Sequence, residues 1–517
     1  MSMRITNKIM QNNSLTNINN NKVQQDKLST QMETGKKITR PSDDPVIAIR
    51  ALRLRSTLSE VTQYCDKNIE DADSWLSVTE DSLVSVTDAI EDMIEQCNTG
   101  SNKDLETANR KTILDNLKAL RDSVYSTGDA DYAGRGLFTG YRTGTKLRFQ
   151  EDTTQQYTIT ESVTKSVIDD ITYVNTQKIE DINEGNYNAA GTTIPEEADI
   201  YQETVHRLRL SYDKLDDTYA TGKEPEISYY DAAGNLQTVK ANVVSKYDTT
   251  KDPYLYAQDP DPANTGVVFI PETGELILSD TMYQTLTSTK DDPSTQNVDE
   301  GAISITYSKT DWRQNDLRPE HYFKCESKGV VYNEDGNVDG MNGDQVIEYD
   351  VGFNQTIRVN TLASEAYTHD IGRDVDDLIN ILEQVDQMED VVNQMKKKVE
   401  ADENDEDAKA ALDAASKAYT YLNQKMQDTF EHSITRMKNH LTTVTKAITE
   451  VGTRSAKVDL VRTRLKSQKT NFRDLVADNE EADTTEVAIE LSSAKLAYDA
   501  SLMATGKIAQ TSLLNYI

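Results

Sequence analysis

Proline is scarce in this chain and is missing from two long stretches of it. There are ten prolines in 517 residues, and none lies within 46–194 or 320–517. Proline in a helix interior costs about 3 kcal/mol, because it removes a hydrogen bond and clashes with the preceding turn. Its absence therefore permits long helices in both flanks, whereas the segment between them holds most of the prolines.

Cysteine, histidine and aromatic residues are also few. The three cysteines are Cys65, Cys97 and Cys325, with no CxxC pair among them, so we expect buried free thiols and no disulfide framework. The five histidines are scattered, and no metal site is predicted. A hydrophobic content of 36% with 7% aromatic residues suits thin, extended helices better than a compact sphere.

Basic residues are outnumbered, which limits the possible partners. The formal net charge of −33 argues against nucleic acid and against anionic membrane surfaces. No apolar run approaches the roughly 18 residues of a membrane span. The first residues show no apolar core of a cleavable secretory signal. We therefore expect a protein that stays in the cytoplasm or leaves the cell by a route that reads another signal.

Motifs of catalysis are missing as well. The chain has no HExxH, P-loop, GxSxG or GxGxxG sequence. Its 88 acidic residues make chance carboxylate pairs inevitable, so such a pair is no sign of an active site. The prediction is a protein without enzymatic activity or cofactor.

The N-terminal flank has the clearest heptad pattern. Asp44 can cap a helix whose first position is Pro45, where the missing N–H costs nothing. A helix is predicted over 46–97, because apolar residues recur there at alternating intervals of three and four. A further helix is predicted over about 104–127. The predicted core of the helical rod on this side consists of Ile69, Leu76, Leu83 and Ile90.

The segment 141–365 has a different texture and is predicted to be a β-rich insert. Short alternating runs at 146–150, 156–160, 267–270 and 303–307 are typical of strands, and turn sequences separate them. The run 355–360 is predicted to be a last strand or part of a returning hairpin. Nothing in the pattern predicts the topology.

The helical pattern returns near residue 375. A polar stretch at 401–407 is predicted to connect two antiparallel helices, and a long helix follows. Its predicted rod core is Ile434, Leu441, Val444 and Ile448. The predicted fold is thus mainly α, an elongated antiparallel helical bundle or coiled coil built from both chain ends, with a β-rich variable domain inserted between them. The predicted segments are 1–45, 46–140, 141–365, 366–470 and 471–517.

The two ends of the chain are predicted to order only on assembly. Apolar residues are sparse before Ser42, and those of the C-terminal helix face several sides, more than one partner covers. Residues 1–60 carry a net charge of about +5 and residues 471–517 about −5, which favours antiparallel pairing, unless both are simply solvated faces. The predicted assembly residues are Ile5, Ile9, Leu15, Ile18, Ile489, Leu491, Leu496, Tyr498, Leu502, Met503 and Ile508.

Several short sequences resemble the flagellin superfamily, over about 1–140 and 365–517. They are MRITN (3–7), GKKITRPSDDPV (35–46), ALRLRS (51–56), NIEDADSWL (68–76), YAGRGLFTG (132–140), AYDASLMATGKI (497–508) and SLLNYI (512–517). SDDP and SLLNYI resemble the junction members of the superfamily more than its filament flagellins. The insert is longer than is usual in the family, and a helix pair at about 375–425 is extra.

The resemblance implies a structural subunit of the bacterial flagellum, in a ring of identical subunits at the junction of hook and filament. It further implies contact with hook-associated protein 1 on the hook side and flagellin on the filament side. It implies export by the flagellar type III apparatus with the help of a cytoplasmic chaperone, and an extracellular location. Two alternatives remain: a filament flagellin, which would dominate sheared flagella, and a cytoplasmic coiled-coil adaptor, which would have stable ends and no export.

Overall fold

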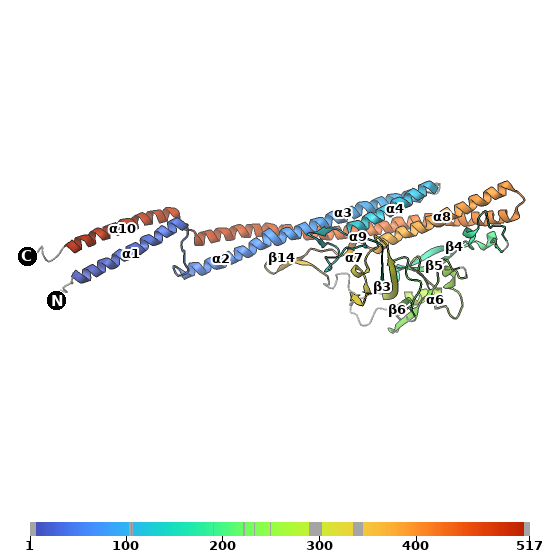
Figure 1. The fold of residues 1–517 in the computed structure, drawn as a ribbon, viewed down its shortest axis with the longest axis horizontal. Coiled ribbons are helices and arrows are strands. Elements are labelled where there is room, and N and C mark those ends of the chain that lie inside the picture. Colours follow the sequence, from blue (N-terminus) through green and yellow to red (C-terminus); the bar gives the residue numbers. More distant parts are fainter. Residues whose placement is uncertain are drawn as a thin grey trace, which may run out of the picture. The chain divides into compact units, whose positions relative to one another are not determined.

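The computed structural model describes residues 7–102, 105, 107–189, 191–220, 223–231, 233–248, 250–288, 302–333 and 345–510. It contains two compact units. The terminal unit comprises 1–72, 349–357 and 456–517, and the central unit comprises 73–348 and 358–455. The predicted fold class, helices from both flanks with a β-rich segment inserted between them, is confirmed (Figure 1). These units divide the helical flanks elsewhere than the five segments predicted above, which stay a prediction.

The terminal unit is helical apart from the tip of one hairpin. Its helices are α1 (Asn7–Thr34), α2 (Pro45–Gln63), the last part of α9 (Glu406–Glu480) and α10 (Thr484–Gln510). Asp44 caps α2, because its carboxylate accepts hydrogen bonds from the backbone N–H of Val46 at 2.9 Å and of Ile47 at 3.2 Å. A π-helical turn, Tyr64–Asn68, joins α2 to α3 (Ile69–Gly100), so the helix predicted over 46–97 is confirmed as one run with an irregular turn.

Four helices of the central unit contact one another in a closed cycle. They are α3, α4 (Thr107–Thr127), α8 (His369–Ala401) and α9. Asn116 of α4 donates to Gln96 of α3 at 3.3 Å, and Arg110 of α4 pairs with Glu389 of α8 at 2.9 Å. Gly100 of α3 packs so closely on Phe430 of α9 that a Cβ would lie 2.3 Å from the ring. The α8–α9 pair, which includes the helices predicted as extra, therefore belongs to this bundle.

The heptad prediction is right for α3 and only partly right for α9. Ile69, Leu76, Leu83 and Ile90 are all fully buried. In α9 only Val444 of the four predicted core residues is buried. The buried row there consists of Phe430, Ser433, Met437, Val444, Ala447, Val451, Val458, Val461 and Leu465.

Three of the four core residues predicted in α9 are thus not in the core. Val444 is buried, but Ile434, Leu441 and Ile448 are only half-buried. The adjacent Ser433 and Ala447, which are polar or small, are buried in place of Ile434 and Ile448. Hydrophobicity favoured the larger residues, whereas close packing of the helices selects the smaller neighbours.

The insert consists of two packed sheets and a hairpin. The first sheet has the order β13 (Val330–Tyr332), β12 (Lys324–Ser327), β3 (Thr153–Thr164), β11 (Ala302–Trp312), β6 (Glu226–Tyr230), β7 (Leu236–Lys240). The second has the order β4 (Ile168–Asn175), β5 (Tyr201–Arg209), β10 (Glu275–Leu278), β9 (Val267–Ile270), β8 (Asn242–Val243). The hairpin of the insert consists of β14 (Glu348–Gly352) and β15 (Gln355–Arg358). A further short hairpin, β1 (Asp131–Tyr132) with β2 (Arg135–Gly136), precedes the insert. Short helices are α5 (Pro253–Tyr256), α6 (Asp280–Thr287) and α7 (Ala363–Ala366).

One apolar core joins the two sheets. Ile159, Ile303 and Tyr307 of the first sheet lie in the same cluster as Phe269 and Leu276 of the second. Within the described residues, β8 and β9 pair in parallel, whereas the other neighbouring strands of the two sheets are antiparallel. The strands predicted at 156–160, 267–270 and 303–307 are confirmed, and 355–358 forms the returning hairpin.

The strand predicted at 146–150 is wrong. This segment makes only an isolated bridge, between Arg148 and Leu317. The carboxylate of Asp129 accepts from the backbone N–H of Leu147 at 2.9 Å, from Arg148 Nε at 2.7 Å and from Gln150 Nε2 at 2.9 Å. The backbone N–H of Phe149 donates to the carbonyl of Asp316 at 2.8 Å, and that of Arg318 to the carbonyl of Leu147 at 2.9 Å. The hydrogen bonds of this segment are therefore divided between the Asp129 side chain and the loop at 315–318.

Leu83→Asp should unfold or strongly destabilise the central unit. Leu83 is fully buried, and an unpaired buried carboxylate costs several kcal/mol. The matched control is Val84→Asp, one residue along the same helix, where the side chain is exposed. Thermal unfolding followed by circular dichroism should show a large loss for the first variant and little for the second. Equal midpoints would refute the assignment of the seam.

Glu161 should make stability depend on pH. It is buried on β3, where burial raises its pKa to about 7 although the Tyr307 hydroxyl and the Ser211 backbone and hydroxyl donate to it. Because the folded protein favours the neutral carboxyl, this contribution to stability is complete below the unfolded pKa of about 4.5 and is lost as the pH rises to about 7. The loss is about 1.4 kcal/mol per pH unit at most.

Urea unfolding of the wild type and of Glu161→Gln at pH 5 and pH 8 tests this. The wild type should lose about 2–3 kcal/mol more than the variant over this range. Glu151→Gln, at an exposed position, should behave as the wild type does. Parallel pH dependence of all three proteins would show that Glu161 is ionised throughout.

Candidate assembly surface

The two terminal helices lie antiparallel, side by side, in the terminal unit (Figure 1). Asn21 of α1 donates to the backbone carbonyl of Ala497 in α10 at 3.4 Å, and the backbone N–H of Ala482 donates to the carbonyl of Gly35 at 2.9 Å. The sequence offered no evident partner for either helix within the chain, and the structure places each against the other. The antiparallel direction is the one that the opposite charges of the two ends favour.

Polar contacts join the C-terminal ends of α1 and α9. Gly35 has a φ of +67°, which a side chain would strain, and it stops α1 as expected from the sequence. The backbone N–H of Lys37 then donates to the carbonyl of Glu480 at 2.7 Å, and the Glu480 carboxylate pairs with Lys36 and Arg55. The ends of α1 and α9 are thus bound to each other where α2 and α10 begin.

Pairing leaves much of the apolar surface of α1 and α10 uncovered. Ile9 and Leu15 are more than half exposed, and Leu496 and Met503 are 71% and 70% exposed. The remaining predicted assembly residues divide as follows: Ile489 and Leu502 are exposed, Ile18, Leu491 and Tyr498 are half-buried, Ile5 lies outside the described residues, and Ile508 lies in α10 with a side chain outside the description. One partner helix therefore does not satisfy either amphipathic surface.

Helix α2 adds exposed residues that the sequence prediction missed. Val46 and Leu52 are 67% and 65% exposed, and Ile49 between them is also exposed. On the same helix the smaller Ala48 and Ala51 are buried. A helix of a soluble monomer normally turns its larger apolar side chains inward. The signal in the sequence was an apolar residue at every third position beside two alanines.

Exposed large apolar side chains are concentrated in the terminal unit. Among the described residues, this unit holds most of them, although it contains the smaller part of the chain. Clustered apolar exposure on a soluble protein marks a site of contact with another molecule. The unit therefore has the chemistry of an assembly surface.

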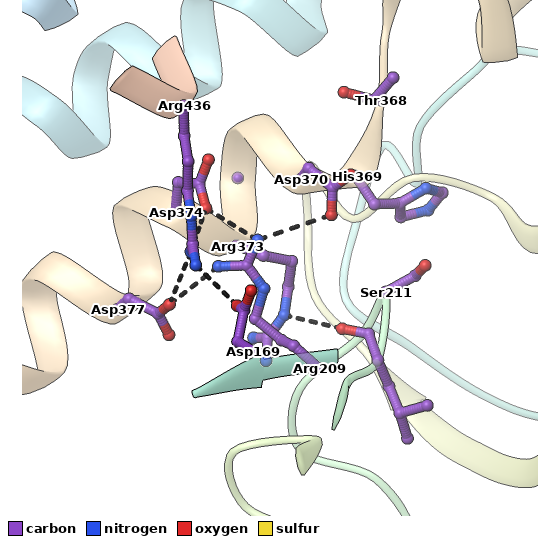
Figure 2. Close-up of polar contacts among 12 residues, drawn as sticks. Asp169, Arg209, Ser211, Thr368, His369, Asp370, Arg373, Asp374, Asp377 and Arg436 are labelled. Atoms are coloured by element: carbon purple, nitrogen blue, oxygen red, sulfur yellow. Dashed lines mark hydrogen bonds and ion pairs between the residues drawn. The ribbon is translucent and has the colours of Figure 1, made fainter. Parts of the chain in front are cut away.

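The central unit holds its charges inside instead, in a cluster between α8, α9 and the second sheet (Figure 2). Asp374 is buried and pairs with Arg209 at 2.7 Å, His440 at 2.8 Å and Arg436 at 3.1 Å. Asp377 pairs with Arg209 at 2.8 Å and with Arg207 at 3.0 Å. Each carboxylate is thus shared by at least two cations.

The electrostatics of this cluster indicate a structural role. Burial alone would raise the pKa of Asp374, but Arg209, the hydrogen bond from His440 and Arg436 together hold it below its usual value. The pKa of Asp377 is lowered in the same way by Arg207 and Arg209, against the effect of burial. Carboxylates kept ionised by arginines do not act as proton donors or bases near neutral pH.

The described residues offer neither a metal-binding cluster nor a membrane-spanning helix. They contain no group of three or more histidine, cysteine or acidic side chains arranged to hold a metal ion. None of the described helices combines the length and apolarity needed to cross a bilayer.

The N-terminal part of the chain is similar in sequence to known flagellar proteins. Residues 5–143 match the bacterial flagellin N-terminal helical region. Flagellar hook-associated protein 3 of Salmonella typhimurium is 32% identical over 142 residues, which is 27% of this chain and 44% of that protein. The protein of the same name from Escherichia coli is 31% identical over 144 residues, 28% of this chain and 45% of its own length. The matches thus span less than half of each relative.

Solved structures of similar proteins overlap this chain only loosely. The flagellar junction protein FlgL of Legionella pneumophila is 11% identical with a TM-score of 0.29, covering 84% of this chain and all of that one. FlgL of Xanthomonas campestris is 12% identical with a TM-score of 0.31, covering 82% of this chain and 99% of that one. The similarity of this chain to known proteins therefore lies in the sequence matches of its N-terminal part. Residues 5–143 of this chain thus match the bacterial flagellin N-terminal helical region, and over 142–144 residues the chain is similar to flagellar hook-associated protein 3.

Proposed function

We propose that this protein is a structural subunit of the bacterial flagellum that forms the junction between hook and filament. The observation that supports this most is the apolar surface left exposed by α1, α2 and α10, in a chain whose relatives are hook-associated proteins. A ring of identical subunits would cover that surface on several sides at once. The role is mechanical and requires no catalytic site.

The proposed partners follow from the position in the flagellum. Hook-associated protein 1 would contact the subunit on the hook side and flagellin on the filament side. A cytoplasmic chaperone would cover the terminal helices before export through the flagellar type III apparatus, since exposed apolar helices aggregate if left free. The protein would then function outside the cell.

A filament flagellin is the second candidate, because the matching family is that of flagellins in general. The amount of protein separates the two roles. A filament subunit would dominate sheared flagella, whereas a junction subunit would be a trace component. Quantitative mass spectrometry of sheared flagella distinguishes them.

Loss of apolar side chains from α10 should block assembly and leave the monomer folded. Leu496→Gln with Met503→Gln removes two side chains that are exposed in the monomer and spaced by two turns. The matched control is Ala497→Gln with Ala504→Gln, at the next exposed positions of the same helix. Electron microscopy should show hooks without filaments for the first double variant and full filaments for the control.

Secretion must be measured separately, since export also depends on the chain ends. Both double variants should be found in the culture medium, and both should unfold at the temperature of the wild type. If the Leu496/Met503 variant is exported and still builds full filaments, α10 is not the assembly surface.

The terminal helices should become fully ordered only in the assembled flagellum. Of the described side chains of α1 and α10, Leu28 and Val487 are the buried apolar ones, so the pair has little to stabilise it alone. Hydrogen exchange of the monomer should be fast over 7–34 and 484–510 and slow over α3. Slow exchange of both ends in the monomer would contradict this.

A further inference from the structure

A polar cavity of about 390 Å³ lies within the central unit, between the second sheet and the α8–α9 pair. Strands β4, β5 and β10 line one side, and α8 and α9 line the other. Its volume falls in the range of small-molecule sites, roughly 300–1,000 Å³. Unlike the usual apolar ligand pocket, this one is lined largely by charged and hydroxyl side chains.

Most charges that line this cavity are already matched. Arg207 pairs with Glu275 at 2.7 Å and with Asp377 at 3.0 Å. Arg436 pairs with Asp169 at 2.6 Å. Among the remaining acidic residues, Asp170 is bonded to His206 at 2.7 Å, and Asp428 is exposed to solvent.

Two lysines line the same cavity and are not matched. Lys425 projects from α9, and Lys246 follows β8. Both side chains are half-buried. Within the described part of the chain, neither ammonium group has an ion pair or a hydrogen bond. Buried cations normally have a partner, because desolvation of an unpaired charge is costly.

We propose that this cavity binds a small oxyanion, either phosphate or a short carboxylate, held between the ammonium groups of Lys425 and Lys246. Such an anion supplies several acceptor oxygens, and each ammonium supplies up to three donors. The hydroxyl groups of Thr172 and Thr429 line the cavity beside them. Since the site lies in the insert and the helix pair beneath it, the proposal does not depend on the flagellar role.

The pKa of Lys425 makes anion binding at this cavity sensitive to pH. Burial lowers its pKa to about 8, while of the facing groups Glu275 and Asp377 raise it and Arg207 and Lys246 lower it. A bound anion would favour the charged ammonium and so raise this pKa. By linkage, the affinity for the anion should then fall as the pH rises above 8.

Competitive labelling of the full-length protein tests the site. The protein is acetylated briefly at pH 8 in sodium chloride, in inorganic phosphate or in citrate at equal ionic strength, and acetylation of each lysine is measured by mass spectrometry. Lys438, exposed on the same helix and outside the cavity, is the internal reference. Phosphate or citrate should slow acetylation of Lys425 at least fivefold relative to Lys438. The anion that protects identifies the ligand class.

A pair of variants provides the second measurement. Phosphate should raise the unfolding temperature of the wild type and of Lys438→Met, and this increase should be absent from Lys425→Met. Unchanged acetylation of Lys425 in both anions would overturn the proposal, as would an equal increase in all three proteins. If Lys425→Met does not fold, the labelling of the wild type still decides.

Discussion

The central unit depends on a buried carboxylate, Asp374, and a half-buried one, Asp377, which lie one turn apart on α8. Arginines of β5 bind them from the sheet, and Arg436 binds them from α9. Removing one member of such a buried pair typically costs about 3–5 kcal/mol, because the other charge stays buried without compensation. Because cations from β5 and from α9 share each carboxylate, these ion pairs constrain how the sheet packs against the helices.

The two units differ in where they place charged and apolar side chains. The central unit closes around its charges and around one apolar core between its sheets. The terminal unit instead keeps small residues of α2 inside and leaves larger apolar ones outside. A surface of this kind is unfavourable in water and becomes favourable when another molecule covers it. The ion pairs therefore bind the insert to α8 and α9, whereas the terminal helices keep apolar surface exposed that another molecule could cover.

The insert is tied to the helix pair at its tip as well as at its base. Tyr187 donates to Asp405 at 2.7 Å, at the turn between α8 and α9, and Lys417 donates to the carbonyl of Glu197 at 2.7 Å. Arg373 donates to the carbonyl of Leu210 at 3.0 Å near the other end. The α8–α9 pair thus supports the insert at both ends of their contact.

Local patterns were sufficient to predict the helices. The proline-free flanks, the cap at Asp44, the stop at Gly35 and the seam of α3 depend on residues a few positions apart, and sequence alone determined them. The exposed candidates on α1 and α10 could also be named from sequence, although the partner of each helix could not.

Only the tertiary structure decided features that depend on residues far apart in the chain. The buried row of α9 runs through Ser433 and Ala447 because neighbouring helices approach too closely for Ile434 or Ile448. The segment 146–150 is not a strand because its backbone hydrogen bonds are divided between the Asp129 carboxylate and the loop at 315–318. The order of the strands, the ion cluster and the cavity beside Lys425 all join segments separated by a hundred residues or more. No short-range spacing encodes such contacts, since they arise from packing of completed elements.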